Sequence, residues 1–212
     1  MNQTRFLQLG WVFFATFAGI ALAGGFQDKS DKIGVVDITK VIEQSDFGKQ
    51  NQDTFAKMKN ARESLLEFID TYRVLTNEQA QRLKDLSLKA TRTKEEDAEM
   101  ERIKADVVAS NKRLNELATK TNMTLEERTL VEEYARRSQT MNEVAQRWFR
   151  EFTADMGDWA DKQKLESVNR ARAAIQDIAK QQGYTVVFEL GVAPYGANDV
   201  SDAALQAMNA KK

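Results

Sequence analysis

The longest helical pattern in the sequence covers residues 124–182, and it constrains the fold more than any other feature. Thr124 and Glu127 form a capping box at its start, in which each side chain can bond the backbone amide of the other residue. Apolar residues then recur at steps of three and four, and no proline follows until Pro194. At 1.5 Å per residue, a helix over residues 125–182 is on the order of 85 Å long. A compact domain of this chain length has no room for such a helix, so we expect an elongated molecule.

A strand-like run follows this helical pattern. Gly183 is a typical helix-ending residue, because glycine readily adopts the left-handed conformation. Residues 185–190 are mostly β-branched or aromatic and have the length of a strand. Residues 33–38, near the other end of the helical section, are a second strand candidate. Residues 192–195 offer a third strand, which Pro194 restricts to a sheet edge or a bulge.

Three shorter helical patterns precede the long one, over residues 40–72, 77–89 and 93–120. Thr76 and Thr93 are suitable N-caps for the second and the third of them. The third has apolar residues at strict three-and-four spacing, as in a coiled coil. From their lengths, we expect the first and third to run end to end along the long helix, with the second at their junction.

An antiparallel helical hairpin would bring the strand candidates together. Residues 32–39 and 183–212 then form a β head, in which Ser201 caps a short final helix, and residues 40–182 form a helical arm. The predicted fold class is therefore α+β, mostly α. The two head segments have 38 residues in total, and chains below about 40 residues rarely bury enough surface to be stable alone. We expect self-association to stabilise the head.

The apolar strand residues of the head are the candidates for this self-association, because the second strand is too apolar for a sheet face in contact with water. They are Val35, Val36, Val186, Val187, Phe188 and Leu190.

The composition argues against an enzyme. The sequence has no His and no Cys, which removes the commonest general base, the usual zinc ligands and the thiol nucleophile. Carboxylates remain, but they form no spaced Asp/Gly loop for calcium, and no glycine-rich phosphate loop is present. We therefore expect no catalytic residue, no cofactor and no metal site.

The charge pattern argues against nucleic-acid binding. Residues 40–180 contain 26 basic and 26 acidic residues, interleaved within each helical turn. This balance is typical of solvated helix faces with pairs at i,i+4 spacing. The sequence pI is about 5.8, and no basic stripe is present to bind phosphates.

Residues 1–23 have the pattern of a secretory signal peptide. Arg5 supplies the positive charge, residues 7–22 the apolar segment, and residues 21–23 a small-residue cleavage site. The alternative is an uncleaved membrane anchor, but the apolar segment is shorter than the roughly 20 residues of a membrane span. We expect cleavage before a polar leader over residues 24–31, with no stable membrane span remaining in the exported protein.

The order of these parts resembles the Skp (OmpH-like) family of periplasmic chaperones. Residues 32–37 are similar to the first strand of that family. The closing segments match more closely, and they comprise residues 174–179, Gly183, Tyr184, residues 186–188, Val192, Ala193, Tyr195 and residues 199–201. The arm differs from that of the compact members in its balanced charge and in the additional residues 76–120.

This resemblance implies a homotrimer in which three sets of strands close one barrel. Three helical arms then surround a cavity that holds unfolded outer-membrane proteins in the periplasm without ATP. Two other functions also agree with long helices. One is a structural coiled-coil spacer of the cell envelope, and the other is a membrane-anchored adaptor that keeps its leader.

The densest aromatic group of the arm comprises Trp148, Phe149, Phe152 and Trp159. Three of them lie on the apolar stripe of the long helix, which favours packing inside the hairpin. Phe149 lies one position off this stripe and is the best candidate for an exposed side chain. The functional alternative is that part of the group lines the client cavity.

Overall fold

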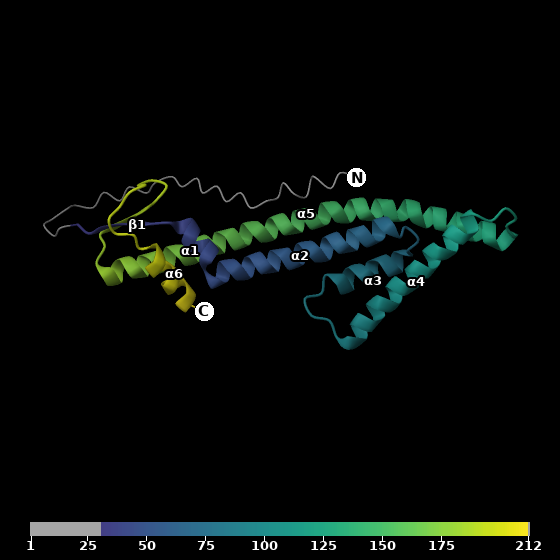
Figure 1. Cartoon of the computed structure of the whole chain (residues 1–212), viewed down its shortest axis with the longest axis horizontal. Helices are drawn as coiled ribbons and strands as arrows, with labels where there is room; N and C mark the ends of the chain where they lie inside the picture. The colour runs from purple at the N-terminus through teal and green to yellow at the C-terminus, as the bar shows by residue number, and fades with distance from the viewer. Residues whose placement is uncertain (1–30, 212) are drawn as a thin grey trace.

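The computed structural model describes residues 31–211. The predicted signal peptide and nearly all of the predicted leader therefore lie outside the described residues. Its elements in chain order are β1 (Ile33–Val36), α1 (Ile38–Gln44), α2 (Asp46–Thr71), α3 (Asn77–Ser87), α4 (Lys94–Ala118), α5 (Leu125–Gln182), β2 (Val186–Glu189) and α6 (Ser201–Ala210). The molecule is elongated, with both strands, α1 and α6 at one end of a long helical arm (Figure 1).

Helix α5 runs the whole length of the arm and confirms the predicted long helix. At its start, the Thr124 hydroxyl accepts a hydrogen bond from the Glu127 amide at 3.3 Å, and the Glu127 carboxylate accepts one from the Thr124 amide at 3.1 Å. At its end, Gly183 has a φ of 71° in the left-handed region, where a side chain would be strained. Thr76 and Thr93 are the N-caps of α3 and α4, as predicted, and each forms a capping box.

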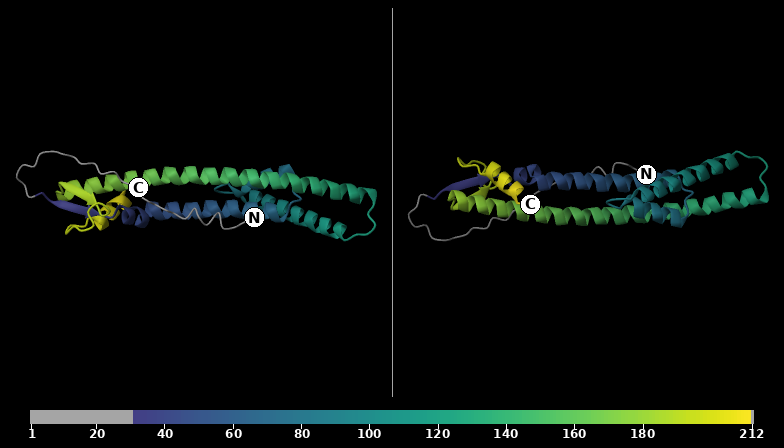
Figure 2. Two further views of the ribbon diagram at one scale, coloured as in Figure 1. Left: turned by 90° about the horizontal axis from the view of Figure 1, so that it is seen from above. Right: turned by 90° about the horizontal axis from the view of Figure 1, so that it is seen from below.

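The other helices pack along α5 in the predicted order. Helix α2 lies along the middle section of α5, with Phe47 beside Arg170 and Arg62 beside Phe152, and α4 reaches the far tip (Figure 1). Helix α3 packs on both α2 and α4 and folds back between them. Seen from above and from below, the molecule is elongated and narrow, with the other helices of the arm running alongside α5 (Figure 2).

The two strands pair in parallel, with Ile33 opposite Val186 and Val35 opposite Phe188. Strand β1 leads away into the arm, α5 returns, and the turn at Gly183 reverses the chain again. Strand β2 therefore runs in the same direction as β1.

The predicted third strand at residues 192–195 is wrong. The amide of Val192 instead bonds the Glu189 carbonyl at 2.9 Å, which turns the chain directly after β2. Residues 198–200 occupy the place beside β1: Val35 donates to the Asn198 carbonyl at 2.8 Å and accepts from the Val200 amide at 2.9 Å.

The first helical pattern is interrupted at Ser45, so the single helix predicted over residues 40–72 is wrong. The buried Ser45 hydroxyl accepts from the Gly48 amide at 2.9 Å and donates to the Ile42 carbonyl at 2.7 Å. A Cβ atom on Gly48 would lie 2.0 Å from the same carbonyl oxygen. The serine thus ends α1 and caps α2, and the sharp bend at this point requires glycine.

Strand β1 is shorter than the predicted strand because α1 begins at Ile38. Asp37 caps α1 by accepting a hydrogen bond from the Lys40 amide at 2.8 Å. The predicted capping role of Ser201 is also wrong, since the N-cap of α6 is Val200. The Ser201 hydroxyl instead accepts from the Asp37 amide at 2.7 Å, which joins the start of α6 to the start of α1.

Two separate hydrophobic cores hold the molecule together. The head core joins β1, α1, α6 and the last turns of α5 through Val36, Ile38, Val41, Ile42, Ala171, Ala174, Ile178, Val200, Ala204 and Met208. The mid-arm core joins α2, α3, α4 and α5 through Leu65, Ile69, Val74, Leu75, Ala80, Leu83, Leu86, Ile103, Val107, Tyr134, Met141, Val144, Trp148 and Phe152.

Candidate functional site

The aromatic group of α5 lies mostly inside the mid-arm core. Trp148 and Phe152 are only 2% and 1% exposed, and their ring centroids are 6.2 Å apart. Lys84 of α3 covers both rings, with its ammonium 5.1 Å from the Trp148 centroid and 5.5 Å from that of Phe152. The same ammonium forms an ion pair with Glu151 of α5 at 2.7 Å. Helix α3 is thus held on α5 by both apolar and charged contacts.

A second cation approaches Phe152 from α2. The Arg62 guanidinium lies 5.4 Å from the Phe152 ring centroid and donates to the Met58 carbonyl at 3.2 Å. Its Nε is buried and has no hydrogen-bond partner among the described residues. Burial lowers the pKa of Arg62, opposed by the charge of Asp155. In the sequence, Arg62 is recognisable as the one charged position in the otherwise apolar stripe of α2.

Phe149 and Trp159 are the more accessible members of the group, since both are half-buried. The Trp159 ring lies 5.9 Å from the ring of Phe55 on α2, closer to the head. The structure therefore brings Trp148 and Phe152 together with Lys84 and separates Trp159 from them along the arm. Phe149 and Trp159 are therefore partly accessible to solvent, whereas Trp148 and Phe152 are not.

The two faces of the β1–β2 sheet have different environments. Val36 and Val187 lie on the inner face, packed in the head core. In the observed register, Ile33, Val35, Val186 and Phe188 share the opposite face. The sequence could not assign these faces, because the strand residues form a continuous apolar run.

We call this opposite side of the sheet the outer face, and it is the main exposed apolar surface of the head. Ile33 is 49% and Phe188 41% exposed. The following loop adds Val192 and Tyr195, which are 59% and 89% exposed. Val35 is buried, because the loop passes over it so closely that a Cβ atom on Gly196 would lie 2.3 Å from its Cγ1. Within residues 31–211, β2 pairs only with β1, so its other edge is open.

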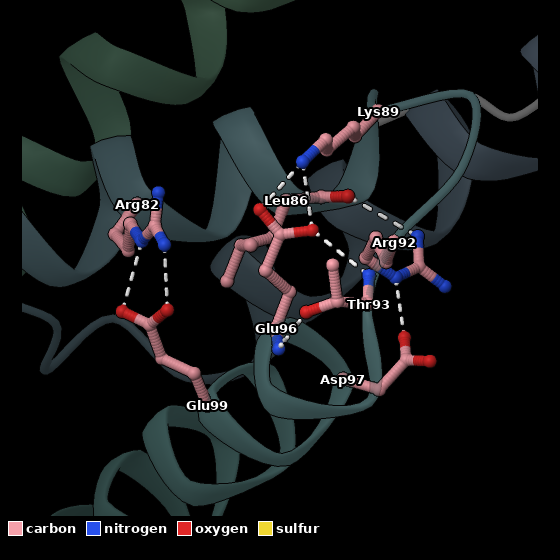
Figure 3. Close-up of polar contacts among 8 residues, drawn as sticks. All are labelled: Arg82, Leu86, Lys89, Arg92, Thr93, Glu96, Asp97 and Glu99. Atoms are coloured by element: carbon pink, nitrogen blue, oxygen red, sulfur yellow. Dashed lines mark hydrogen bonds and ion pairs between the residues drawn. The ribbon is translucent and has the colours of Figure 1, made fainter.

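Charged contacts shape the elbow between α3 and α4, which comprises residues 82–99 (Figure 3). The Arg82 guanidinium binds both carboxylate oxygens of Glu99, at 2.8 and 2.6 Å. Lys89 donates to Glu96 at 2.6 Å, and Arg92 donates to Asp97, also at 2.6 Å. Glu96 belongs to the α4 capping box as well, so one carboxylate supports both the helix start and the turn.

The elbow is expected to loosen in acid. Hydrogen bonds from Lys89 and Arg82 lower the pKa values of Glu96 and Glu99 below their usual 4.5. Their stabilising effect is therefore fully present above pH 4.5 and is lost as the pH falls through the lower folded values. Hydrogen exchange of the elbow amides, corrected for intrinsic rates, should accelerate between pH 5 and pH 3 relative to the mid-arm core.

A Glu96→Gln, Glu99→Gln double variant is the control for this prediction. It should show elbow exchange that is already fast at pH 5 and changes little with acid. Equal pH dependence in this variant and in the unmodified protein would contradict the assignment to these two carboxylates.

In the part of the chain that the structure describes, no helix combines the length and the apolar character needed to cross a bilayer. The described residues form a small head of strands and short helices on a long helical arm, and the head has an apolar outer face.

Comparison with known families agrees with this architecture. Residues 32–208 match the family model described as Outer membrane protein (OmpH-like). The match covers most of the chain, which therefore belongs to the OmpH-like family, also called the Skp/OmpH family. This is a family of periplasmic chaperones rather than enzymes, which suggests a chaperone-type function toward outer-membrane proteins. A search of curated proteins found no match.

Proposed function

We propose that this protein is a periplasmic holdase that binds unfolded outer-membrane proteins without ATP. The observation that carries the proposal is the OmpH-like match over residues 32–208, which includes both strands, the entire arm and most of α6. A chain without a glycine-rich phosphate loop has no evident means of binding nucleotide. Client release then occurs because each contact is weak, so that a partner with higher affinity for the client can displace this protein.

The working form is a homotrimer whose subunits associate through the outer face of the head. Exposed apolar surface around an open sheet edge is typical of a surface that another chain covers. Ile33, Phe188, Val192 and Tyr195 provide this surface, and the open edge of β2 can pair with a neighbouring strand. Three heads closing one barrel place three arms around a common cavity.

Client contact takes place along the arm, through adaptable apolar side chains. Phe149 and Trp159 are the accessible aromatic candidates, while Trp148 and Phe152 support the mid-arm core. The balanced charge of the arm provides no net field to steer a charged client. Binding should therefore depend little on salt.

Export through residues 1–23, followed by removal of this signal, would deliver the head and arm to the periplasm. The membrane-anchored adaptor is the competing possibility, and the N-terminal residue of the purified protein distinguishes the two. A mature chain that starts near Gly24 supports the holdase, whereas a retained leader supports the adaptor.

The test of holding is light scattering during dilution of a denatured outer-membrane barrel protein. The protein should suppress aggregation without nucleotide, and equally at low salt and at about 0.5 M salt, where charges are screened within a few ångströms. Phe149→Ser should weaken this protection while the trimer remains intact. Gln146→Ser, at an exposed position of the same helix, is the matched control and should have no effect.

Two results would contradict this account. Absence of protection by the unmodified trimer would leave the structural spacer as the better function. Protection that disappears at high salt would mean that charged groups, rather than Phe149 and its neighbours, hold the client.

A further inference from the structure

Helix α3 is a short amphipathic helix that docks on the rest of the arm through one apolar face. Its buried residues are Ala80, Leu83 and Leu86, which are spaced three positions apart and are each 1% exposed. Non-helical links over residues 72–76 and 88–93 join α3 to α2 and α4. An isolated helix of this length is only marginally stable in water, so α3 depends on the surface on which it docks.

The surface that α3 covers is aromatic and carries a negative charge. It includes Trp148 and Phe152, whose rings lie within 5.5 Å of the Lys84 ammonium, and Glu151, which forms an ion pair with the same ammonium at 2.7 Å. Aromatic faces and a carboxylate both attract a cation. We call this surface the α3 site. It matches a helix with regularly spaced apolar residues and a lysine.

The contacts that hold α3 are few in comparison with those of the other arm helices. The ion pair between Arg82 and Glu99 joins α3 to α4, but its side chains are 43% and 30% exposed. Ion pairs at such exposed positions contribute little to stability. Segments with few buried contacts open at a lower free energy than the whole molecule. When α3 leaves, Leu65, Val107 and Met141 still join α2, α4 and α5.

We propose that the α3 site binds an amphipathic helix of a partner protein, and that α3 is the occupant which this partner displaces. The partner helix carries apolar residues three positions apart and a lysine, as α3 does, and it binds by the helix-in-groove mode. Without a partner, α3 keeps Trp148 and Phe152 covered. Use of the site by an unfolded client depends on the proposed holdase function, whereas the site itself does not.

The test uses a fluorescent peptide with residues 76–89 of this sequence, added to the purified whole protein. Fluorescence anisotropy gives its apparent dissociation constant. Because α3 competes from within the chain, binding to the unmodified protein should be weak. Leu83→Ala in the protein weakens the docking of its own α3, so the peptide should bind more tightly, on the order of tenfold. Lys84→Gln in the protein leaves no cavity and should change the affinity in the same direction.

Displacement of α3 is measured independently with a buried cysteine. The chain contains no cysteine of its own, so Ala80→Cys places a single thiol on the docked face of α3. A thiol reagent modifies this position only when α3 opens, and slow labelling reports the open population. Saturating peptide should accelerate the labelling, and Leu83→Ala should accelerate it by about the same factor by which it tightens peptide binding.

Two controls lie in the head core, away from α3. Ala174→Cys is a matched buried thiol, and its labelling should not respond to the peptide. Ile178→Ala removes apolar contact from the head core and should leave peptide affinity unchanged. A peptide with Lys84→Gln should bind several-fold more weakly than the original peptide, because it lacks the cation that the site attracts.

Three outcomes would overturn the proposal. The first is absence of peptide binding to the Leu83→Ala protein while its helix content is unchanged. The second is an affinity that neither Leu83→Ala nor Lys84→Gln in the protein alters, which would place the peptide elsewhere. The third is Ala80→Cys labelling that saturating peptide does not accelerate. None of these measurements uses an unfolded client, so failure of the light-scattering assay would contradict the holdase and leave the α3 site standing.

Discussion

Phe188→Asp is expected to convert the proposed trimer into folded monomers. Phe188 lies on the outer face, 41% exposed in the single chain, and it contacts a neighbouring subunit if that face is the interface. A carboxylate there loses apolar contact in the trimer and must be buried without a partner, at a cost of several kcal/mol. Sedimentation should show the monomer mass, and circular dichroism should show an unchanged helix content.

Val187→Asp is the matched control, because Val187 is the next residue of the same strand and lies on the inner face. The same charge there is placed in the head core of its own subunit. This variant should lose the folded head, with a lower unfolding midpoint. A Phe188→Asp variant that stays trimeric would show that the outer face is not the interface.

Trp148→Ala is expected to have the largest effect on the stability of the arm. Trp148 is 2% exposed and contacts Phe152 and Lys84 in the mid-arm core. Truncation of a fully buried aromatic side chain costs about 3–5 kcal/mol through lost burial and the cavity that remains. Denaturant unfolding followed by circular dichroism should show this loss as a shift of the arm transition, with the head transition unchanged.

The comparison with Phe149→Ala separates an effect on stability from an effect on the proposed client binding. Phe149 is half-buried, so its truncation should destabilise the arm much less than that of Trp148. If both variants lose holding but only Trp148→Ala loses stability, Phe149 acts by contact and Trp148 by supporting the arm. Equal destabilisation by the two variants would contradict the distinction between them.

Local signals in the sequence were sufficient to predict the helical arm. The capping boxes at Thr76, Thr93 and Thr124 depend on residues three positions apart, and each is present in the structure. Gly183 ends α5 because its own backbone adopts the left-handed conformation. Such interactions form within one helical turn and need no distant partner. The length and the ends of α5 were therefore predictable.

Features that depend on distant contacts were not predictable in the same way. Ser201 has the residue type of a helix cap, but its hydroxyl accepts from the Asp37 amide, a residue far away in the sequence. Residues 192–195 have a strand-like composition, but the place beside β1 is occupied by residues 198–200. In both cases a tertiary partner decided the role of the residue. The split of the first helix at Ser45 likewise depends on the close approach that Gly48 permits.

By itself, the sequence determined that the protein has a long helical arm and an apolar β head, because helix caps and hydrophobic periodicity act over short distances. Only the tertiary structure decided which apolar residues serve which purpose. It placed Trp148 inside a core and left Phe149 half-buried, and it turned Val187 inward and Phe188 outward. Adjacent residues of similar character received different environments because burial depends on which helices and strands pack against each face. A linear apolar pattern does not contain that information.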